Sequence, residues 1–248
     1  MKVFISLSSF SQVSDKPLTI LNSKGYEVVL NPYKRKLTKE ECLKHYSDVD
    51  GIIAGTERID KDVLTLAKKL KVISRVGVGL DSIDLECART NGIEVYTSQT
   101  LPSIAVAELS LGLMIDVLRK ISQHNTSLKN GEWIKSSGSL MYGKTFGIVG
   151  CGKIGKALVS LTKGFEVKYL AYDQETDNEF ARLHGIRYVD LSCLLKQSDV
   201  VSINISKSSD TADLIGAAEL AMMKKDAVLI NTARGGIVSE DALVEALR

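Results

Sequence analysis

Residues 145–155 read Thr-Phe-Gly-Ile-Val-Gly-Cys-Gly-Lys-Ile-Gly, and this segment sets the architecture of the second half of the chain. Its apolar start predicts a buried strand, and the periodicity of residues 153–163 predicts an amphipathic helix directly after it. The glycines between them have the G-x-G-x-x-G spacing of a dinucleotide-binding turn. Gly150 permits the tight turn, Gly152 lets the backbone approach a pyrophosphate, and Gly155 allows close packing of the helix.

An acidic residue in the expected place supports this interpretation. Asp173 lies 18 residues after Gly155, at the end of the next predicted strand, where a carboxylate accepts hydrogen bonds from ribose hydroxyls. A carboxylate also repels a 2′-phosphate, and the next residue is Gln174 rather than an arginine. We therefore expect NAD rather than NADP as cofactor.

Short apolar runs alternate with helical periodicity along the whole chain, which is typical of α/β proteins with parallel sheets. We expect strands at residues 3–7, 27–30, 51–54, 72–75, 93–96, 145–149, 167–171, 186–189, 200–204 and 227–231. Thr38 with Glu41 forms a candidate capping box, and Asp60 is a candidate helix cap.

One long helix is expected to start at Pro102 and run toward Gly131, with an apolar stripe along one side. We place the domain boundary just before it, giving domains at residues 1–98 and 99–248. The second half has five predicted strands where a doubly wound dinucleotide domain commonly has six. We therefore expect the second domain to be C-terminally incomplete, with the apolar side chains of the last helix partly uncovered; these are Ala242, Leu243, Ala246 and Leu247.

Composition favours a small-molecule partner. Lys and Arg number 32 and Asp and Glu 30 among 248 residues, and these charges are interspersed. Because no basic stripe is present, we expect neither nucleic acid nor a membrane surface as partner. The most apolar stretch, residues 109–118, is too short to span a bilayer, so we expect a cytoplasmic protein. The four cysteines form no C-x-x-C pair, so we expect no metal site and no disulfide framework.

Two further loops are candidates for anion binding. Arg75-Val76-Gly77-Val78-Gly79 leads from a strand toward a helix, and its glycines suit either a backbone anion site or a plain tight turn. Arg234 follows the last predicted strand, and ligands of open α/β sheets bind at the carboxyl ends of strands. A guanidinium there can hold a carboxylate bidentately and polarise a neighbouring carbonyl.

Together these motifs resemble the D-isomer-specific 2-hydroxyacid dehydrogenases, particularly the phosphoglycerate dehydrogenase branch. The landmarks are RVGVGLDSIDL at residues 75–85, VAEL at 106–109, GKTFGIVGCGKIGKAL at 143–158, YD at 172–173 and INTARGGIV at 230–238. The resemblance implies two Rossmann-like domains, a flavodoxin-like substrate domain and a doubly wound NAD-binding domain. It also implies hydride transfer between NAD and a 2-hydroxy or 2-oxo acid, and a homodimer formed through the NAD-binding domain. A phosphoglycerate substrate would imply a role in serine biosynthesis.

The resemblance also assigns roles to residues. It makes Arg234 the catalytic arginine that binds the substrate carboxylate and polarises its carbonyl. It makes Gly77, Val78 and Gly79 the carboxylate-binding backbone, with Arg75 beside them. The expected cofactor-binding residues are Gly150, Gly152, Lys153, Ile154, Gly155, Asp173, Asn204, Ser206, Thr211, Thr232 and Ala233.

The chain departs from the family pattern in three places. Ser206 replaces a usual proline, and Thr97-Ser98-Gln99 replaces Asn-Thr-Pro in the segment between the domains. Gly55-Thr56 occupies the loop where phosphoglycerate enzymes carry an arginine for the substrate phosphate.

The family chemistry also needs a His and a Glu beyond the catalytic arginine, whereas the histidines here, His45, His124 and His184, fall on predicted helices. The expected activity is NAD-dependent dehydrogenation of a D-2-hydroxy acid, with 3-phosphoglycerate as the first candidate and glyoxylate or hydroxypyruvate reduction as the alternative. A NAD-sensing binding protein without catalysis, or a truncated pseudoenzyme, remains open at this point.

Overall fold

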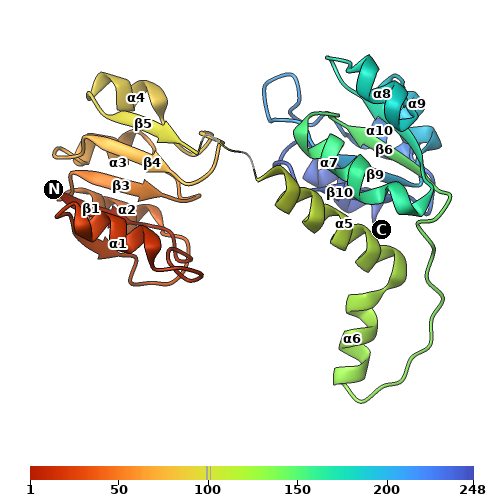
Figure 1. The fold of residues 1–248 in the computed structure, drawn as a ribbon, viewed down its shortest axis with the longest axis horizontal. Coiled ribbons are helices and arrows are strands. Elements are labelled where there is room, and N and C mark those ends of the chain that lie inside the picture. Colours follow the sequence, from red (N-terminus) through yellow and green to blue (C-terminus); the bar gives the residue numbers. More distant parts are fainter. Residues whose placement is uncertain (99, 101) are drawn as a thin grey trace. The chain divides into compact units, whose positions relative to one another are not determined.

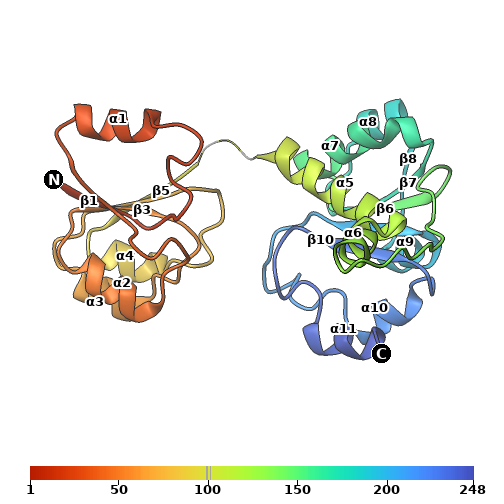
Figure 2. The same ribbon diagram turned by 90° about the horizontal axis from the view of Figure 1, so that it is seen from below.

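The computed structural model describes residues 1–98, 100 and 102–248, which form two units, Met1–Leu101 and Pro102–Arg248. Within the described residues, each unit holds one five-stranded parallel sheet with helices on both faces (Figures 1 and 2). The expected second domain starts at residue 99, which lies outside the described residues.

In the first unit the strand order is β2-β1-β3-β4-β5, the flavodoxin-like arrangement. Helix α1 covers one face of the sheet, and α2, α3 and α4 cover the other (Figure 2). The strands are β1 (Lys2–Ile5), β2 (Glu27–Leu30), β3 (Gly51–Ala54), β4 (Val72–Arg75) and β5 (Glu94–Thr97), and the helices are α1 (Lys16–Ser23), α2 (Lys39–Tyr46), α3 (Lys61–Leu66) and α4 (Leu85–Thr90).

In the second unit the strand order is β10-β9-β6-β7-β8, which is the doubly wound order with the first strand of the unit in the middle. Helices α5, α7 and α8 lie on one face, and α9, α10 and α11 on the other (Figure 2). The strands are β6 (Thr145–Val149), β7 (Lys168–Tyr172), β8 (Ile186–Tyr188), β9 (Val200–Ile203) and β10 (Val228–Asn231). The helices are α5 (Ser103–Arg119), α6 (Ile121–Lys129), α7 (Lys153–Thr162), α8 (Asn178–His184), α9 (Leu191–Gln197), α10 (Ala217–Met222) and α11 (Glu240–Ala246), with a 3₁₀ turn, η1, at Lys163–Phe165.

Both sheets are held by apolar side chains that pack against the helices on their two faces. In the first unit, Phe4 and Ile73 pack with Tyr46 in one buried cluster. In the second, Phe146 and Ile148 pack with side chains of α5 and α7 in another. Because both faces of a parallel sheet are covered by helices, its strands can be apolar almost throughout.

Local signals predicted most of these elements. In the described residues all ten predicted strands are present, with ends within two residues of their predicted positions. The capping box of Thr38 and Glu41 is confirmed, and Asp60 caps α3 by accepting a hydrogen bond from the amide of Val63 at 3.3 Å.

The single long helix expected between Pro102 and Gly131 is wrong. The chain forms two helices, α5 and α6, separated by Lys120 in the left-handed conformation with φ of 54°. The carboxylate of Asp116 accepts hydrogen bonds from the amide and hydroxyl of Ser122 at 2.6 and 2.7 Å, and so caps the start of α6. Helix α6 and the segment after it project away from the sheet of their own unit (Figure 1). No helix in the described part of the chain is both long enough and apolar enough to cross a lipid bilayer.

Candidate functional site

The turn between β6 and α7 leaves room for a ligand at one glycine and closes tightly at two others. Gly150 has φ of 92°, and a Cβ there would lie 2.7 Å from Cγ2 of Ile205, in the loop after β9. A Cβ on Gly155 would lie 2.5 Å from the carbonyl oxygen of Gly150. By contrast, a Cβ on Gly152 would meet no atom within 4 Å. Gly152 also precedes the first residue of α7, where backbone amides and the helix dipole attract an anion.

Asp173 follows β7 and lies beside this turn. One of its carboxylate oxygens accepts a hydrogen bond from the amide of Cys151 at 2.7 Å, and the other accepts one from the amide of Glu175 at 3.2 Å. These bonds fix the carboxylate at the carboxyl edge of the sheet. Burial raises the pKa of the Cys151 thiol, so this cysteine stays protonated and packs as an apolar side chain.

A pocket of about 360 Å³ opens between this turn and the loop after β9. It brings together six of the residues expected to bind the cofactor, namely Gly150, Gly152, Asp173, Asn204, Ser206 and Thr211. It also includes six that the sequence reasoning did not assign, namely Tyr172, Gln174, Ile205, Ser208, Asp210 and Leu214. All of these lie within three residues of an expected site residue, so extending the loops after β7 and β9 would have found them.

The lining of this pocket suits a ribose that has no 2′-phosphate. Its lining includes the carboxyl groups of Asp173 and Asp210 and no lysine or arginine among the described residues. The open space at Gly152 suits the pyrophosphate, and the carboxylate of Asp173 suits a pair of ribose hydroxyls. These features agree with NAD as the cofactor.

The loop after β9 is held in shape by Thr211. Its hydroxyl accepts a hydrogen bond from the amide of Ser208 at 2.7 Å and donates one to the carbonyl of Ser206 at 2.8 Å. The side-chain oxygen of Asn204 accepts a hydrogen bond from the hydroxyl of Ser202 at 3.1 Å. The side-chain amide of Asn204 donates to the carbonyl of Ser202 at 3.3 Å. These bonds explain how the loop forms a pocket wall without the proline that the resemblance leads one to expect at Ser206.

The other expected cofactor residues lie outside this pocket lining. Lys153, Ile154 and Gly155 form the first turn of α7, of which Lys153 is exposed and Gly155 is buried. Thr232 and Ala233 lie in the turn after β10. The hydroxyl of Thr232 lies 2.7 Å from that of Ser110 on α5, which ties this turn to the helix.

Arg234 lies at the carboxyl end of β10 in a turn closed by Asn231. The side chain of Asn231 donates to the carbonyl of Arg234 at 2.9 Å and accepts from the amide of Ala233 at 3.1 Å. Arg234 itself is exposed and donates to the carbonyl of Ala233 at 2.8 Å. The turn thus presents a guanidinium at the carboxyl edge of the sheet.

In the first unit, the chain turns sharply at Gly77 in the loop after β4. Gly77 has φ of 126°, and its amide donates to the hydroxyl of Ser98 at 3.0 Å. The guanidinium of Arg75 folds back over this loop and donates to the carbonyl of Val76. Val78 is 37% exposed, so the loop lies at the surface of its unit.

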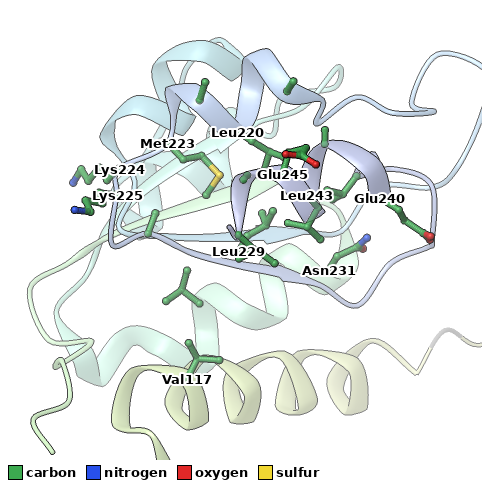
Figure 3. Close-up of a pocket in the computed structure, with 18 of the residues that line it drawn as sticks. Val117, Leu220, Met223, Lys224, Lys225, Leu229, Asn231, Glu240, Leu243 and Glu245 are labelled. Carbon is green, nitrogen blue, oxygen red and sulfur yellow. The ribbon is translucent and has the colours of Figure 1, made fainter.

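A larger cavity, of about 990 Å³, lies along the edge of β10 between α5, α10 and α11 (Figure 3). Figure 3 shows Val117, Leu220, Leu229 and Leu243 around it. The apolar side chains that were expected to be partly uncovered at the last helix all line this cavity; they are Ala242, Leu243, Ala246 and Leu247. It shares no lining residue with the pocket at Gly152, so we do not assign it to the cofactor.

The described residues show no metal site, and their histidines lie on helices. No group of three or more His, Cys, Asp and Glu side chains there is arranged to hold a metal ion. His45, His124 and His184 lie on α2, α6 and α8, as expected.

Comparisons with known proteins agree with this geometry. Residues 111–248 match the family model described as "D-isomer specific 2-hydroxyacid dehydrogenase, NAD binding domain". The chain is 42% identical over 217 residues to the D-3-phosphoglycerate dehydrogenase of Methanocaldococcus jannaschii, an alignment that covers 86% of this chain and 41% of that protein. It is 35% identical over 257 residues to the glyoxylate reductase of Thermococcus litoralis, covering 100% of this chain and 76% of that protein.

Among solved structures, the apo-structure of D-lactate dehydrogenase from Escherichia coli is similar with a TM-score of 0.85 and 28% identity. That match covers 100% of this chain and 78% of the other. The chain spans less than half the length of the phosphoglycerate dehydrogenases of Methanocaldococcus jannaschii and Archaeoglobus fulgidus, at 41% and 46%.

Proposed function

Because the chain belongs to the D-isomer-specific 2-hydroxyacid dehydrogenase family, we propose that it transfers a hydride between NAD(H) and a D-2-hydroxy or 2-oxo acid. The observation that carries this proposal is the open space at Gly152, beside Asp173, in a pocket whose described lining residues include no lysine or arginine. It supports binding of NAD at the carboxyl edge of the sheet that also carries Arg234.

The residues of this chain supply binding and polarisation. Arg234 holds the substrate carboxylate with its guanidinium and polarises the adjacent carbonyl. In the loop of Gly77, Val78 and Gly79, the amides of Val78 and Gly79 bind the carboxylate, with Arg75 as a nearby positive charge. When bound, the nicotinamide would supply or accept the hydride, and solvent water would supply or take up the proton of the hydroxyl group.

We propose a 3-phosphoglycerate-type acid as the first substrate to test, because two similar proteins carry the name D-3-phosphoglycerate dehydrogenase. One observation favours an unphosphorylated acid such as glyoxylate or hydroxypyruvate instead. In the loop after β3, the amide of Gly55 donates to the buried carboxylate of Glu57 at 3.1 Å. This loop therefore carries an acid where a phosphate site would need a cation.

The experiment is a panel of 2-oxo acids with NADH, followed at 340 nm, on wild type and Arg234→Gln. We expect turnover by wild type, and at least a hundredfold loss of kcat/KM in Arg234→Gln with NADH affinity unchanged, which corresponds to about 2.7 kcal/mol or more. Turnover restricted to 3-phosphohydroxypyruvate would support the phosphoglycerate type, and indifference to the phosphate would support the second candidate. NADH binding without turnover of any acid would contradict the proposed activity and favour a NAD-responsive binding protein.

We also propose that the chain forms a homodimer through its second unit. Helix α6 and the segment after it present several large apolar side chains to solvent; these are Ile121, Leu128, Trp133, Ile134 and Leu140. Trp133 is 85% exposed. Exposed apolar surface of this kind marks interaction sites. Sedimentation equilibrium is expected to give a dimer for wild type and a monomer for Trp133→Ser, and a monomeric wild type would contradict the proposal.

A further inference from the structure

Ser98 binds Gly77, in the loop after β4, through two reciprocal hydrogen bonds. Its hydroxyl accepts a hydrogen bond from the amide of Gly77 at 3.0 Å. Its own amide donates to the carbonyl of Gly77 at 3.1 Å. The two residues are 21 positions apart, so the contact exists only because β4 and β5 are neighbours in the sheet.

The hydroxyl is needed because the strand pairing stops at this point. The amide of Val76 donates to the carbonyl of Ala54 on the β3 side, at 2.9 Å. The next amide, that of Gly77, therefore faces β5, whose last residue is Thr97. Ser98 supplies a side-chain oxygen as the acceptor for this amide. With it the backbone can leave the sheet at Gly77 with φ of 126° without losing this hydrogen bond.

The side chain of Arg75 lies over the same loop and donates to the carbonyl of Val76. It lies so close over the loop that a Cβ on Gly77 would collide with its Nη1 atom. Its Nε atom is buried and has no hydrogen-bond partner among the described residues. The guanidinium of Arg75 puts a positive charge beside the turning backbone of this loop, which favours an anionic ligand there.

We propose that Ser98 is a positioning residue of the substrate site. It holds Gly77 so that the amides of Val78 and Gly79, together with Arg75, face one carboxylate of the substrate. The inference rests on the proposed function, because that function makes the ligand of this loop a 2-oxo or 2-hydroxy acid. Ser98 itself acts through Gly77 and does not carry out chemistry.

The test compares Ser98→Ala with two matched variants. Ser98→Thr keeps the hydroxyl. Ser47→Ala removes a serine hydroxyl that donates to the carbonyl of Lys44 at 3.2 Å on an exposed turn. The probe is oxamate, an unreactive analogue of a 2-oxo acid, titrated calorimetrically into each protein saturated with NADH. The dissociation constant of NADH and the thermal midpoint are measured for the same samples.

We expect Ser98→Ala to raise the dissociation constant of oxamate about five- to tenfold, the usual effect of one lost hydrogen bond. Ser98→Thr and Ser47→Ala should stay within about twofold of wild type, and all four proteins should bind NADH equally. In addition, the amides of Val78 and Gly79 should exchange with solvent faster in Ser98→Ala than in Ser98→Thr.

Two kinds of result would overturn the inference alone. One is wild-type oxamate affinity in Ser98→Ala. The other is a loss in Ser98→Ala that Ser98→Thr does not rescue, or that extends equally to NADH with a lowered thermal midpoint, since this would indicate a structural role only. If the wild-type protein binds NADH but not oxamate, the proposed function fails first and the inference fails with it.

Discussion

Replacing Gly152 by alanine should weaken cofactor binding strongly and leave folding intact. The backbone at this residue has φ of −74° and ψ of −155°, which alanine adopts readily, and a Cβ there meets no atom within 4 Å. Alanine should therefore keep the stability unchanged or raise it by up to about 1 kcal/mol, because it restricts the unfolded chain. The methyl group would occupy the space through which a pyrophosphate approaches the backbone.

The size of the binding loss follows from the bonds that the methyl group prevents. A hydrogen bond to a charged group contributes about 1.5–3 kcal/mol. Loss of one such bond to the pyrophosphate would weaken NADH binding by about 10- to 150-fold. The neighbouring glycine provides the contrast, because a Cβ on Gly155 would lie 2.5 Å from the carbonyl oxygen of Gly150 and 3.0 Å from Cγ2 of Ile148. Overpacking of this kind costs about 1–3 kcal/mol and lowers the midpoint by about 2–12 °C.

The assay measures the NADH dissociation constant by fluorescence and the thermal midpoint with and without NADH. Gly164→Ala is the matched control, because a Cβ at Gly164 in η1 also meets no atom within 4 Å and lies outside the pocket. At the same NADH concentration, the midpoint should rise less in Gly152→Ala than in wild type and Gly164→Ala. The reasoning is refuted if Gly152→Ala binds NADH as wild type does, or if it is destabilised as strongly as Gly155→Ala.

Three further predictions concern other groups. Glu57→Gln should destabilise the first unit by about 1–3 kcal/mol in urea unfolding, because the buried carboxylate accepts hydrogen bonds from Ser6, Tyr46 and the amide of Gly55, and an amide NH₂ would face these donors; unchanged stability would contradict this account. Asp173→Ala should weaken NADH binding about tenfold and NADPH binding less, measured by calorimetry, because the carboxylate favours ribose hydroxyls and repels a 2′-phosphate. Burial raises the pKa of Cys42 from 9.0 to about 11. The contribution of this raised pKa to stability is fully present below pH 9 and is lost as pH rises toward 11, because the unfolded thiol ionises first. The free energy of unfolding should therefore fall across this window by up to about 1.4 kcal/mol per pH unit from this thiol. A Cys42→Ser variant that keeps the full slope would contradict this prediction.

The break between α5 and α6 illustrates where prediction from sequence fails. The apolar stripe continues past residue 120, so periodicity alone predicts one helix. Helix α5 ends at Arg119, and Lys120 turns left-handed. The Asp116 carboxylate bonds the amide and hydroxyl of Ser122, and this side-chain competition with the helical hydrogen bonds is not revealed by periodicity.

The pocket shows the same limit. Gly150, Gly152 and Asp173 follow from motif spacing, whereas Tyr172, Ile205 and Asp210 were not expected as lining residues. The place of Tyr172 depends on β7 pairing with β6. The places of Ile205 and Asp210 depend on β9 lying next to β6, which brings the loop after β9 against Gly150.

The sequence by itself determined the alternating strands and helices, the glycine turn before α7 and the caps of α2 and α3. Each of these depends on residues only a few positions apart, whose backbone preferences and hydrogen bonds are local. The tertiary structure decided the contact of Ser98 with Gly77, the burial of Glu57 among its donors, and the wall of the pocket at Gly152. These join residues that are distant in the chain, and the order of strands in each sheet determines which of them meet.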